Sequence, residues 1–272
     1  MAGLRVEGLR FSYGGREVLK GVDFEAHAGD FIAVLGPNGV GKSTMFKCVL
    51  GFLPHYGGRV LVDGDDARGL SRKELARRVA YIPQSSDQVF DYSVLELVLM
   101  GAATRLPLFK TPGREEEERA MAVLEDLGIA HLAHKGCGQV SGGEYQLVLL
   151  ARTLLQEASI LIMDEPTANL DYGNQYRVME RIAGLSRRDF IIMMAAHDPN
   201  QVLLHATRAL VIDDGAVRAD GRPAEVMTGD LLSSLYGIDV HRLTVDDAGR
   251  RVDMCVPAGL GPSGLSCGRT AR

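Results

Sequence analysis

Residues 36–44 of this chain read Gly36-Pro37-Asn38-Gly39-Val40-Gly41-Lys42-Ser43-Thr44. An apolar run at residues 31–35 precedes them and predicts a buried strand, while residues 45–50 predict a helix. The spacing matches G-x-x-x-x-G-K-[ST], a loop that cradles phosphates between a strand and a helix. Its glycines let backbone N–H groups turn toward one anion, and the helix dipole adds positive potential there. A simple turn has no need of Lys and Ser at the helix start, so we expect the chain to bind a nucleoside triphosphate.

A second apolar run supplies the acids that such a loop requires. Residues 160–165 read Ile-Leu-Ile-Met-Asp-Glu, a predicted buried strand that ends on two carboxylates. Both this strand end and the loop lie at C-terminal ends of strands, so we expect them to be neighbours. Asp164 would hold Mg²⁺ through water, with the Ser43 hydroxyl as a direct ligand, and Lys42 would reach the outer phosphates. Glu165 would polarise the attacking water as general base.

A second candidate phosphate site begins at Ser141. The sequence there is Ser141-Gly142-Gly143-Glu144-Tyr145-Gln146, and it opens an apolar helix that runs through Leu154. Ser141 and Glu144 would form an ordinary capping box. However, a serine and two glycines at a helix N-terminus also suit a phosphate. Capping does not explain two phosphate cradles in one chain.

Composition excludes several classes of protein. The chain has 272 residues, of which 46% are hydrophobic and 24% charged, so it can bury a sizeable core. A net charge of −5 without a strong basic block disfavours a nucleic-acid surface. No apolar run approaches the roughly 20 residues of a spanning helix, and the N-terminus lacks the apolar core of a signal peptide. We therefore expect a protein made in the cytosol, with at most a peripheral contact with a membrane.

The order of the predicted elements indicates an α/β fold with an insertion. Between about residues 85 and 155 the pattern predicts helices, at 93–101 and 114–127 among others, and no strand. Outside this segment the patterns predict strands at residues 4–9, 17–25, 58–63, 79–82, 159–163, 190–195 and 208–213. A small hairpin is expected near residues 243–256, and the Gly-, Pro- and Ser-rich residues from 257 on are expected to be disordered.

Together these motifs resemble the ATP-binding subunit of an ABC transporter over about residues 3–240. The resemblance implies a P-loop NTPase core with a mixed parallel sheet, an antiparallel β-subdomain and an inserted α-helical subdomain at about residues 85–155. Residues 1–240 would be a single ABC ATPase domain, residues 241–256 a small C-terminal extension and residues 257–272 a tail.

The resemblance also implies roles for single residues. Residues 141–144 resemble the signature motif, Gln84 would be the Q-loop glutamine, His197 the switch histidine, and Asp171 part of the D-loop. The implied catalytic residues are Glu165, His197 and Gln84. The implied Mg²⁺ ligands are Ser43, Gln84 and Asp164. The implied ATP contacts are Tyr13 (stacked on adenine), Gly36, Pro37, Asn38, Gly39, Gly41, Lys42, Ser43, Thr44, Ser141, Gly142, Gly143 and Asp171. Taken singly, Tyr13, Gln84 and His197 would be a turn aromatic, a loop amide and a strand-end histidine.

The family works as a head-to-tail dimer in which the P-loop of one copy and the signature helix of the other enclose each ATP. The resemblance therefore implies a homodimer that hydrolyses ATP with Mg²⁺. It further implies separate transmembrane permease subunits and a periplasmic or extracellular substrate-binding protein. The subunit would lie at the cytoplasmic face of the cell membrane.

Three loops resemble one branch of the family, the importers of metal chelates such as ferric siderophores, haem and cobalamin. These loops are residues 86–94, 167–175 and 197–200. Two positions depart from the usual pattern: Val140 replaces a Leu, and Tyr145 an Arg or Lys. The alternatives are an ABC ATPase of another class (a molybdate-type oxyanion importer, an exporter or a non-transport protein), a different P-loop enzyme such as a small-molecule kinase, and a structural binding module. Residues 141–144 disfavour the kinase, and Glu165 disfavours the structural module.

Overall fold

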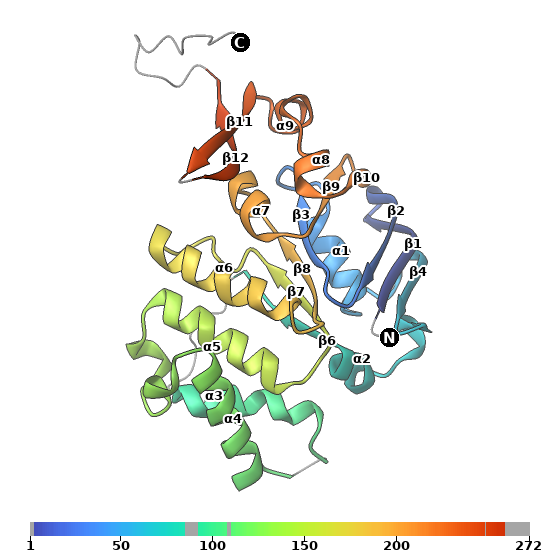
Figure 1. Ribbon diagram of the computed structural model, residues 1–272. Helices are drawn as coiled ribbons and strands as arrows, with labels where there is room; N and C mark the ends of the chain where they lie inside the picture. Colours follow the sequence, from blue (N-terminus) through green and yellow to red (C-terminus); the bar gives the residue numbers. More distant parts are fainter. Residues whose placement is uncertain (1–2, 85–91, 108–109, 248, 259–272) are drawn as a thin grey trace.

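The computed structural model describes residues 3–84, 92–107, 110–247 and 249–258 (Figure 1). Part of the branch-specific loop at residues 86–94, and all of the predicted tail but its first two residues, lie outside the described residues. Within the described residues, no helix is both long and apolar enough to cross a bilayer.

A six-stranded sheet with the order β10-β9-β3-β8-β7-β6 forms the centre of the fold. All neighbouring strands run parallel except β10, which is antiparallel to β9. The strands are β3 (Phe31–Leu35), β6 (Val79–Ile82), β7 (Ile160–Asp164), β8 (Ile191–Ala195), β9 (Arg208–Asp213) and β10 (Ala216–Gly221). β3, β7 and β8 are buried along their whole length, because parallel strands are covered on both faces. The strands predicted at residues 31–35, 79–82, 159–163, 190–195 and 208–213 are confirmed, and β10 is an additional strand.

Each face of this sheet meets a different layer. Along β3, Ile32 and Val34 pack with the antiparallel sheet, whereas Phe31 and Leu35 pack with the helices. The antiparallel sheet has the order β2-β1-β4-β5. Its strands are β1 (Gly3–Tyr13), β2 (Arg16–His27), β4 (Gly57–Val62) and β5 (Asp65–Asp66), and α1 (Lys42–Val49) lies between the two sheets. The predicted strands are confirmed, although β1 and β2 extend to the turn at Gly14.

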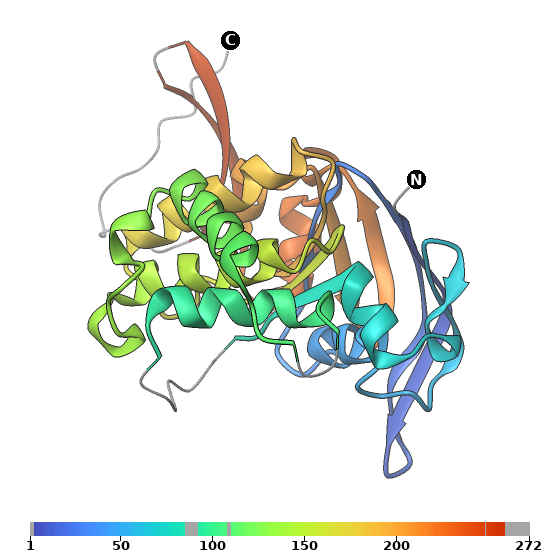
Figure 2. The ribbon, with the colours of Figure 1, turned by 90° about the horizontal axis from the view of Figure 1, so that it is seen from below.

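The helical layer lies on the opposite side of the core from the antiparallel sheet (Figures 1 and 2). It contains α3 (Val94–Leu99), α4 (Arg114–Asp126) and α5 (Gly142–Leu155), with 3₁₀ turns at Met100–Thr104, Ala130–Leu132 and Cys137–Gln139. Val98, Leu124 and Leu149 of the three helices are buried in the same apolar cluster. The described part of residues 92–155 contains no strand beyond an isolated bridge from Ser93 to Gly136, as the pattern predicts.

Three further helices connect the strands of the core. α2 (Arg72–Arg78) precedes β6, and α6 (Tyr172–Ser186) lies between the core sheet and α5. A helix that the sequence analysis missed, α7 (Pro199–His205), follows β8. The Asp198 carboxylate caps it by accepting from the Asn200 backbone N–H (2.8 Å), and Pro199 occupies its first position.

The last described elements are α8 (Pro223–Val226), α9 (Gly229–Tyr236) and a hairpin of β11 (Val240–Asp247) and β12 (Arg250–Pro257) that projects from the body (Figures 1 and 2). The side-chain amide of Asn200 holds the hairpin against α7. Its Nδ2 donates to the Cys255 carbonyl (3.2 Å), and its Oδ1 accepts from the Cys255 N–H (2.7 Å).

Candidate active site

The P-loop lines a cavity of about 400 Å³ beyond the C-terminal ends of β3, β7 and β8. Its walls are Asn38, Gly39, Gly41, Lys42, Ser43, Thr44, Gln84, Glu165 and His197. These residues come from four separate parts of the chain, and all of them belong to the predicted site. The parallel sheet brings them together because its loops emerge at one edge.

Two P-loop glycines are required by space and by backbone geometry. A Cβ at Gly36 would lie 2.3 Å from the Ile212 carbonyl oxygen. Gly41 has φ 116°, and a Cβ there would lie 2.8 Å from the side chain of Leu19. Side chains at either position would push the loop away from β9 or β2 and deform the cradle.

The buried ammonium of Lys42 crosses the loop from its helical end. Its Nζ donates to the carbonyl oxygens of Gly36 (2.6 Å) and Pro37 (3.1 Å). Burial lowers the pKa of Lys42, while the negative charges of Glu165 and Asp164 act to raise it. An anion in the cavity would therefore meet a cation that is already poorly hydrated.

The three predicted catalytic side chains meet at the carboxylate of Glu165. Gln84 Nε2 donates to Glu165 Oε2 (2.7 Å), and His197 Nε2 is in hydrogen-bond contact with Oε1. Glu165 itself has φ 52°, in the left-handed region that non-glycine residues seldom adopt. Such conformations persist where the surroundings hold them and cluster at functional sites.

Asp164 lies one residue earlier, at the buried end of β7. Burial raises the pKa of its carboxyl, Glu165 raises it further, and the Ser43 hydroxyl and Lys42 lower it. Among the described residues its Oδ1, although buried, has no hydrogen-bond partner. A carboxylate oxygen left without a donor beside a hydroxyl is the donor set of a hard cation, so Asp164 and Ser43 fit Mg²⁺.

Besides Gly36 and Pro37 of the P-loop itself, five predicted ATP contacts do not line this cavity: Tyr13, Ser141, Gly142, Gly143 and Asp171. Tyr13 is 47% exposed at the end of β1, where its ring packs edge-on against Phe11. The other four lie together at the N-termini of α5 and α6. There a Cβ at Gly143 would lie 2.6 Å from the side chain of Asn174. The N–H of Asn174 donates to Asp171 (2.9 Å), so the signature and the D-loop are neighbours within one chain.

Sequence reasoning missed a hydrogen-bonded group behind Glu165, namely Thr167, Gln175 and Gln201. These side chains and Glu165 line a second cavity of about 320 Å³. One signal in the sequence could have revealed Gln201. Asp-Pro after His197 is a helix start, which places Gln201 one turn along the new helix.

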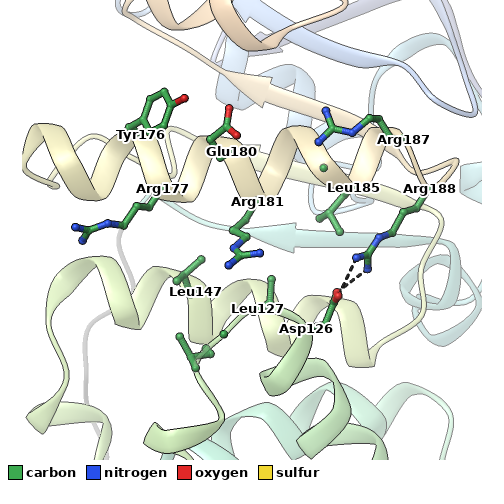
Figure 3. A pocket seen from close by; sticks show the side chains of 13 residues that line it. Asp126, Leu127, Leu147, Tyr176, Arg177, Glu180, Arg181, Leu185, Arg187 and Arg188 are labelled. Carbon is green, nitrogen blue, oxygen red and sulfur yellow. Dashed lines mark hydrogen bonds and ion pairs between the residues drawn. The ribbon is translucent and has the colours of Figure 1, made fainter.

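A larger cavity of about 730 Å³ separates α6 from the helical layer (Figure 3). Arg177, Arg181 and Arg188 point into it, and the Arg188 guanidinium donates twice to the Asp126 carboxylate (2.5 and 2.8 Å). None of its lining residues is a predicted site residue. The ion pair joins the end of α4 to the core just after α6, so this cavity marks the boundary between the two layers.

Comparison with known proteins identifies the family. A family model described as "ABC transporter" matches residues 19–168. The chain is 36% identical over 246 residues to a probable iron chelatin transport ATP-binding protein of Helicobacter pylori, covering 90% of this chain and 96% of that protein. It is 33% identical over 260 residues to the ferric enterobactin transport ATP-binding protein FepC of Escherichia coli, covering 95% of each.

A third relative and a solved structure agree with these matches. The chain is 38% identical over 235 residues to the hemin import ATP-binding protein HmuV of Nocardia farcinica, covering 86% of this chain and 81% of that protein. A putative metal-chelate type ABC transporter in an inward-facing conformation superposes with a TM-score of 0.84 at 29% identity, covering 94% of this chain and 98% of that one.

This chain therefore belongs to the ABC transporter family as an ATP-binding subunit, an ATPase. Its relatives are ATP-binding subunits of importers for ferric enterobactin, haem, cobalamin and iron chelate. The predicted family and the predicted α/β P-loop NTPase fold are confirmed. The roles of the single site residues remain predictions.

Proposed function

We propose that this chain hydrolyses ATP to power an importer of a metal chelate, such as a ferric siderophore, haem or cobalamin. One observation carries the catalytic part: the Glu165 carboxylate is held by Gln84 and His197 at the P-loop cavity. The relatives support the cargo class, because their names specify ferric enterobactin, hemin, cobalamin and iron chelatin.

In the proposed reaction, the P-loop amides and Lys42 bind the outer phosphates of ATP. Glu165 accepts a proton from water as the water oxygen bonds to the γ-phosphorus and the bond to the β–γ bridging oxygen breaks. His197 orients the carboxylate and faces the γ-phosphate. Mg²⁺, when bound, would be held by Ser43, Gln84 and Asp164 and would neutralise phosphate charge.

The proposal includes a head-to-tail homodimer. Ser141, Gly142 and Asp171 are exposed and lie outside the P-loop cavity, so a second copy could present them to the phosphates of the first. Tyr13 is likewise free on one side to stack on adenine. In this assembly residues 1–240 act as one ABC domain with its helical subdomain at about 85–155, and residues 241–256 form the extension.

A transmembrane permease is the proposed partner on the helical layer. An apolar groove of about 610 Å³ lies beside α3, and its lining includes Leu99, Met100, Leu106 and Pro107. Met100 is 41% exposed there, which is the kind of surface that marks a protein contact. The subunit would bind at the cytoplasmic face of the cell membrane, and a periplasmic or extracellular binding protein would deliver the cargo.

The proposed function is tested by uptake in a strain that lacks this chain. Labelled ferric siderophore, haem, cobalamin and molybdate are offered in turn, with rescue by wild type and by Glu165→Gln. We expect loss of uptake for one of the metal chelates, restored by wild type alone. Loss of molybdate uptake only, or no loss in a strain without a redundant system, would contradict metal-chelate import.

A further inference from the structure

The loop that follows β7 is tied to the first turn of α7 by a chain of side-chain hydrogen bonds. The Thr167 hydroxyl donates to Gln201 Oε1 (3.3 Å), and Gln201 Nε2 donates to Gln175 Oε1 (2.9 Å). Gln175 Nε2 returns to the loop by donating to the Thr167 carbonyl oxygen (3.2 Å) and the Leu170 carbonyl oxygen (3.0 Å). The three side chains thus join the loop, α6 and α7.

These contacts close a ring that contains the proposed catalytic pair. Thr167 lies two residues after Glu165, and Gln201 lies four residues after His197. His197 in turn contacts Glu165. Both members of the pair line the cavity of about 320 Å³ that Thr167, Gln175 and Gln201 also line. A shift of α7 relative to the loop would therefore change the contact between His197 and Glu165.

The ring is specific because each amide uses both its donor and its acceptor. Gln201 accepts from a hydroxyl and donates to Gln175, so its amide has one favoured orientation. Thr167 is buried, with 7% of its surface exposed. Removing one member would leave partly buried polar groups unpaired, which costs more than the net gain of a typical hydrogen bond.

The backbone of Glu165 needs such support. Its φ of 52° is unfavourable for a residue with a side chain, and strained residues persist when neighbouring contacts over-determine them. Within the loop, the Ala168 N–H donates to the Glu165 carbonyl oxygen (3.2 Å), and the Leu170 N–H donates to the Thr167 carbonyl oxygen (3.2 Å). Side-chain hydrogen bonds then anchor Thr167 and Leu170 to α6, and Thr167 to α7.

We propose that Thr167, Gln175 and Gln201 are positioning residues for ATP hydrolysis, which hold Glu165 and His197 in their reactive arrangement. The proposal rests on the proposed role of Glu165 as general base. The three residues touch neither the P-loop nor its cavity, so they act on the hydrolytic step and leave nucleotide binding unchanged.

The test compares three substitutions in the full-length chain by steady-state ATPase kinetics. Thr167→Val keeps the shape but removes the hydroxyl, and Gln201→Glu keeps an acceptor but removes the donor to Gln175. Because small misplacements of reacting groups are costly, we expect kcat to fall about 10- to 100-fold in both, with KM for ATP unchanged within about twofold. Thr167→Ser keeps the hydroxyl and should retain kcat within about twofold.

Thr153→Val is the matched control. Thr153 is also buried, and its hydroxyl donates to the Leu149 carbonyl oxygen (2.8 Å) within α5, away from the ring. This variant should lose stability like Thr167→Val and keep kcat. Equal losses of kcat in both valine variants would show a general effect of destabilisation and would overturn the positioning role.

A double mutant separates the two proposals. If the ring acts through Glu165, Thr167→Val should lower the residual turnover of a Glu165→Gln chain by less than about twofold. A further 10- to 100-fold loss of turnover in the double mutant would overturn the positioning role of the ring. A wild-type kcat in Thr167→Val, together with an inactive Glu165→Gln, would also overturn it. Wild-type turnover in Glu165→Gln alone would instead overturn the catalytic assignment on which the ring rests.

Discussion

Glu165 combines a strained backbone with a fully engaged carboxylate. Its φ of 52° turns the chain sharply as it leaves β7, and its two carboxylate oxygens face Gln84 and His197. A carboxylate held on both sides cannot rotate freely, so its position relative to an attacking water is set in advance. Preorganisation of this kind is what a general base requires.

Replacing Glu165 by Gln should separate nucleotide binding from hydrolysis. The amide keeps the shape of the side chain but has only one acceptor oxygen and cannot accept the proton, so turnover should fall by about 10²- to 10⁴-fold. ATP affinity, measured by equilibrium titration, should stay within about threefold, and the ATP-bound variant should elute as a stable dimer. Glu180→Gln, on the exposed face of α6, is the control and should hydrolyse ATP normally. Retained turnover in Glu165→Gln would exclude Glu165 as the base.

Lys42 predicts how ATP affinity depends on pH. Burial lowers the pKa of the free side chain, and a bound phosphate should raise it, because opposite charges favour the protonated form. The contribution of Lys42 to ATP affinity is therefore fully present below the pKa of the free side chain and is lost as the pH rises from that pKa through the higher pKa of the ATP-bound side chain. We expect a fall of up to about tenfold per pH unit once the pKa of the free side chain is passed.

The measurement is the ATP dissociation constant over a series of buffers up to about pH 10, near the ordinary lysine pKa. Lys42→Ala should bind weakly with little slope over the same range. Lys47→Ala, an exposed lysine of α1, should keep the slope of the wild type. An equal slope in Lys42→Ala would mean that another group controls binding.

Sequence alone predicts residues whose chemistry is local. Lys42, Ser43 and Asp164 stand in motifs whose spacing implies their neighbours, and the structure places each at the predicted edge of the sheet. Gln201 could not be recognised in this way. Its partners Gln175 and Thr167 are 26 and 34 residues away, and only the packing of α6 and α7 brings them together.

At the scale of elements, the N-terminus of α5 has a geometry that suits both helix capping and phosphate binding. Ser141 and Glu144 cap it reciprocally (Ser141 N–H to Glu144, 2.8 Å; Glu144 N–H to Ser141, 3.3 Å). Ser71 and Glu74 cap α2 with nearly the same distances, 2.8 and 3.2 Å. Capping explains both helix starts, but only α5 adds two glycines after the serine. Comparing substitutions of Ser141 and Ser71 therefore separates an effect on fold stability from an effect on catalysis.

Ser141→Ala and Ser71→Ala should destabilise the fold equally and differ in activity. Each loses one N-cap, at a cost of about 1 kcal/mol in the free energy of unfolding. Only Ser141→Ala should lower kcat, by about tenfold or more, because it also loses a phosphate donor in the dimer. Urea unfolding and ATPase assays on both variants decide the question. Equal ATPase activities in the two variants would show that Ser141 acts only as a helix cap.

Helices and strands could be predicted where hydrophobic periodicity or capping residues mark them in the sequence. The alternation along β1 and β2 gave their positions but not their length, since bulges between Val6 and Leu9 and near Phe11 interrupt the register. The helix α7 was missed because its apolar face is short: Val202 is its one buried residue. Its start was nevertheless marked by Asp198 and Pro199.

At the scale of the whole molecule, three layers keep two phosphate-binding features apart. The P-loop lies between the core sheet and the antiparallel sheet, whereas the signature lies at the start of α5 in the helical layer. The Arg188–Asp126 ion pair is a polar link across the boundary between core and helical layer. A family motif could predict both features, but their separation depends on how the inserted helices pack, which no local pattern encodes.

That separation has a genetic consequence. No residue of the signature lines the P-loop cavity of its own chain, so in the proposed dimer each site takes one half from each copy. Two inactive alleles, Lys42→Ala and Ser141→Arg, should then complement each other, because one of the two sites in a mixed dimer receives both intact halves. About half of randomly paired dimers would be mixed, so co-expression should restore part of the uptake.

Placing both lesions in one copy should give the opposite phenotype. When the double mutant pairs with a wild-type chain, each of the two sites receives one defective half. Both sites are then inactive, so the double mutant should act as a dominant negative allele. Absence of complementation between the single alleles, with both chains stably expressed, would show that each chain builds its site alone.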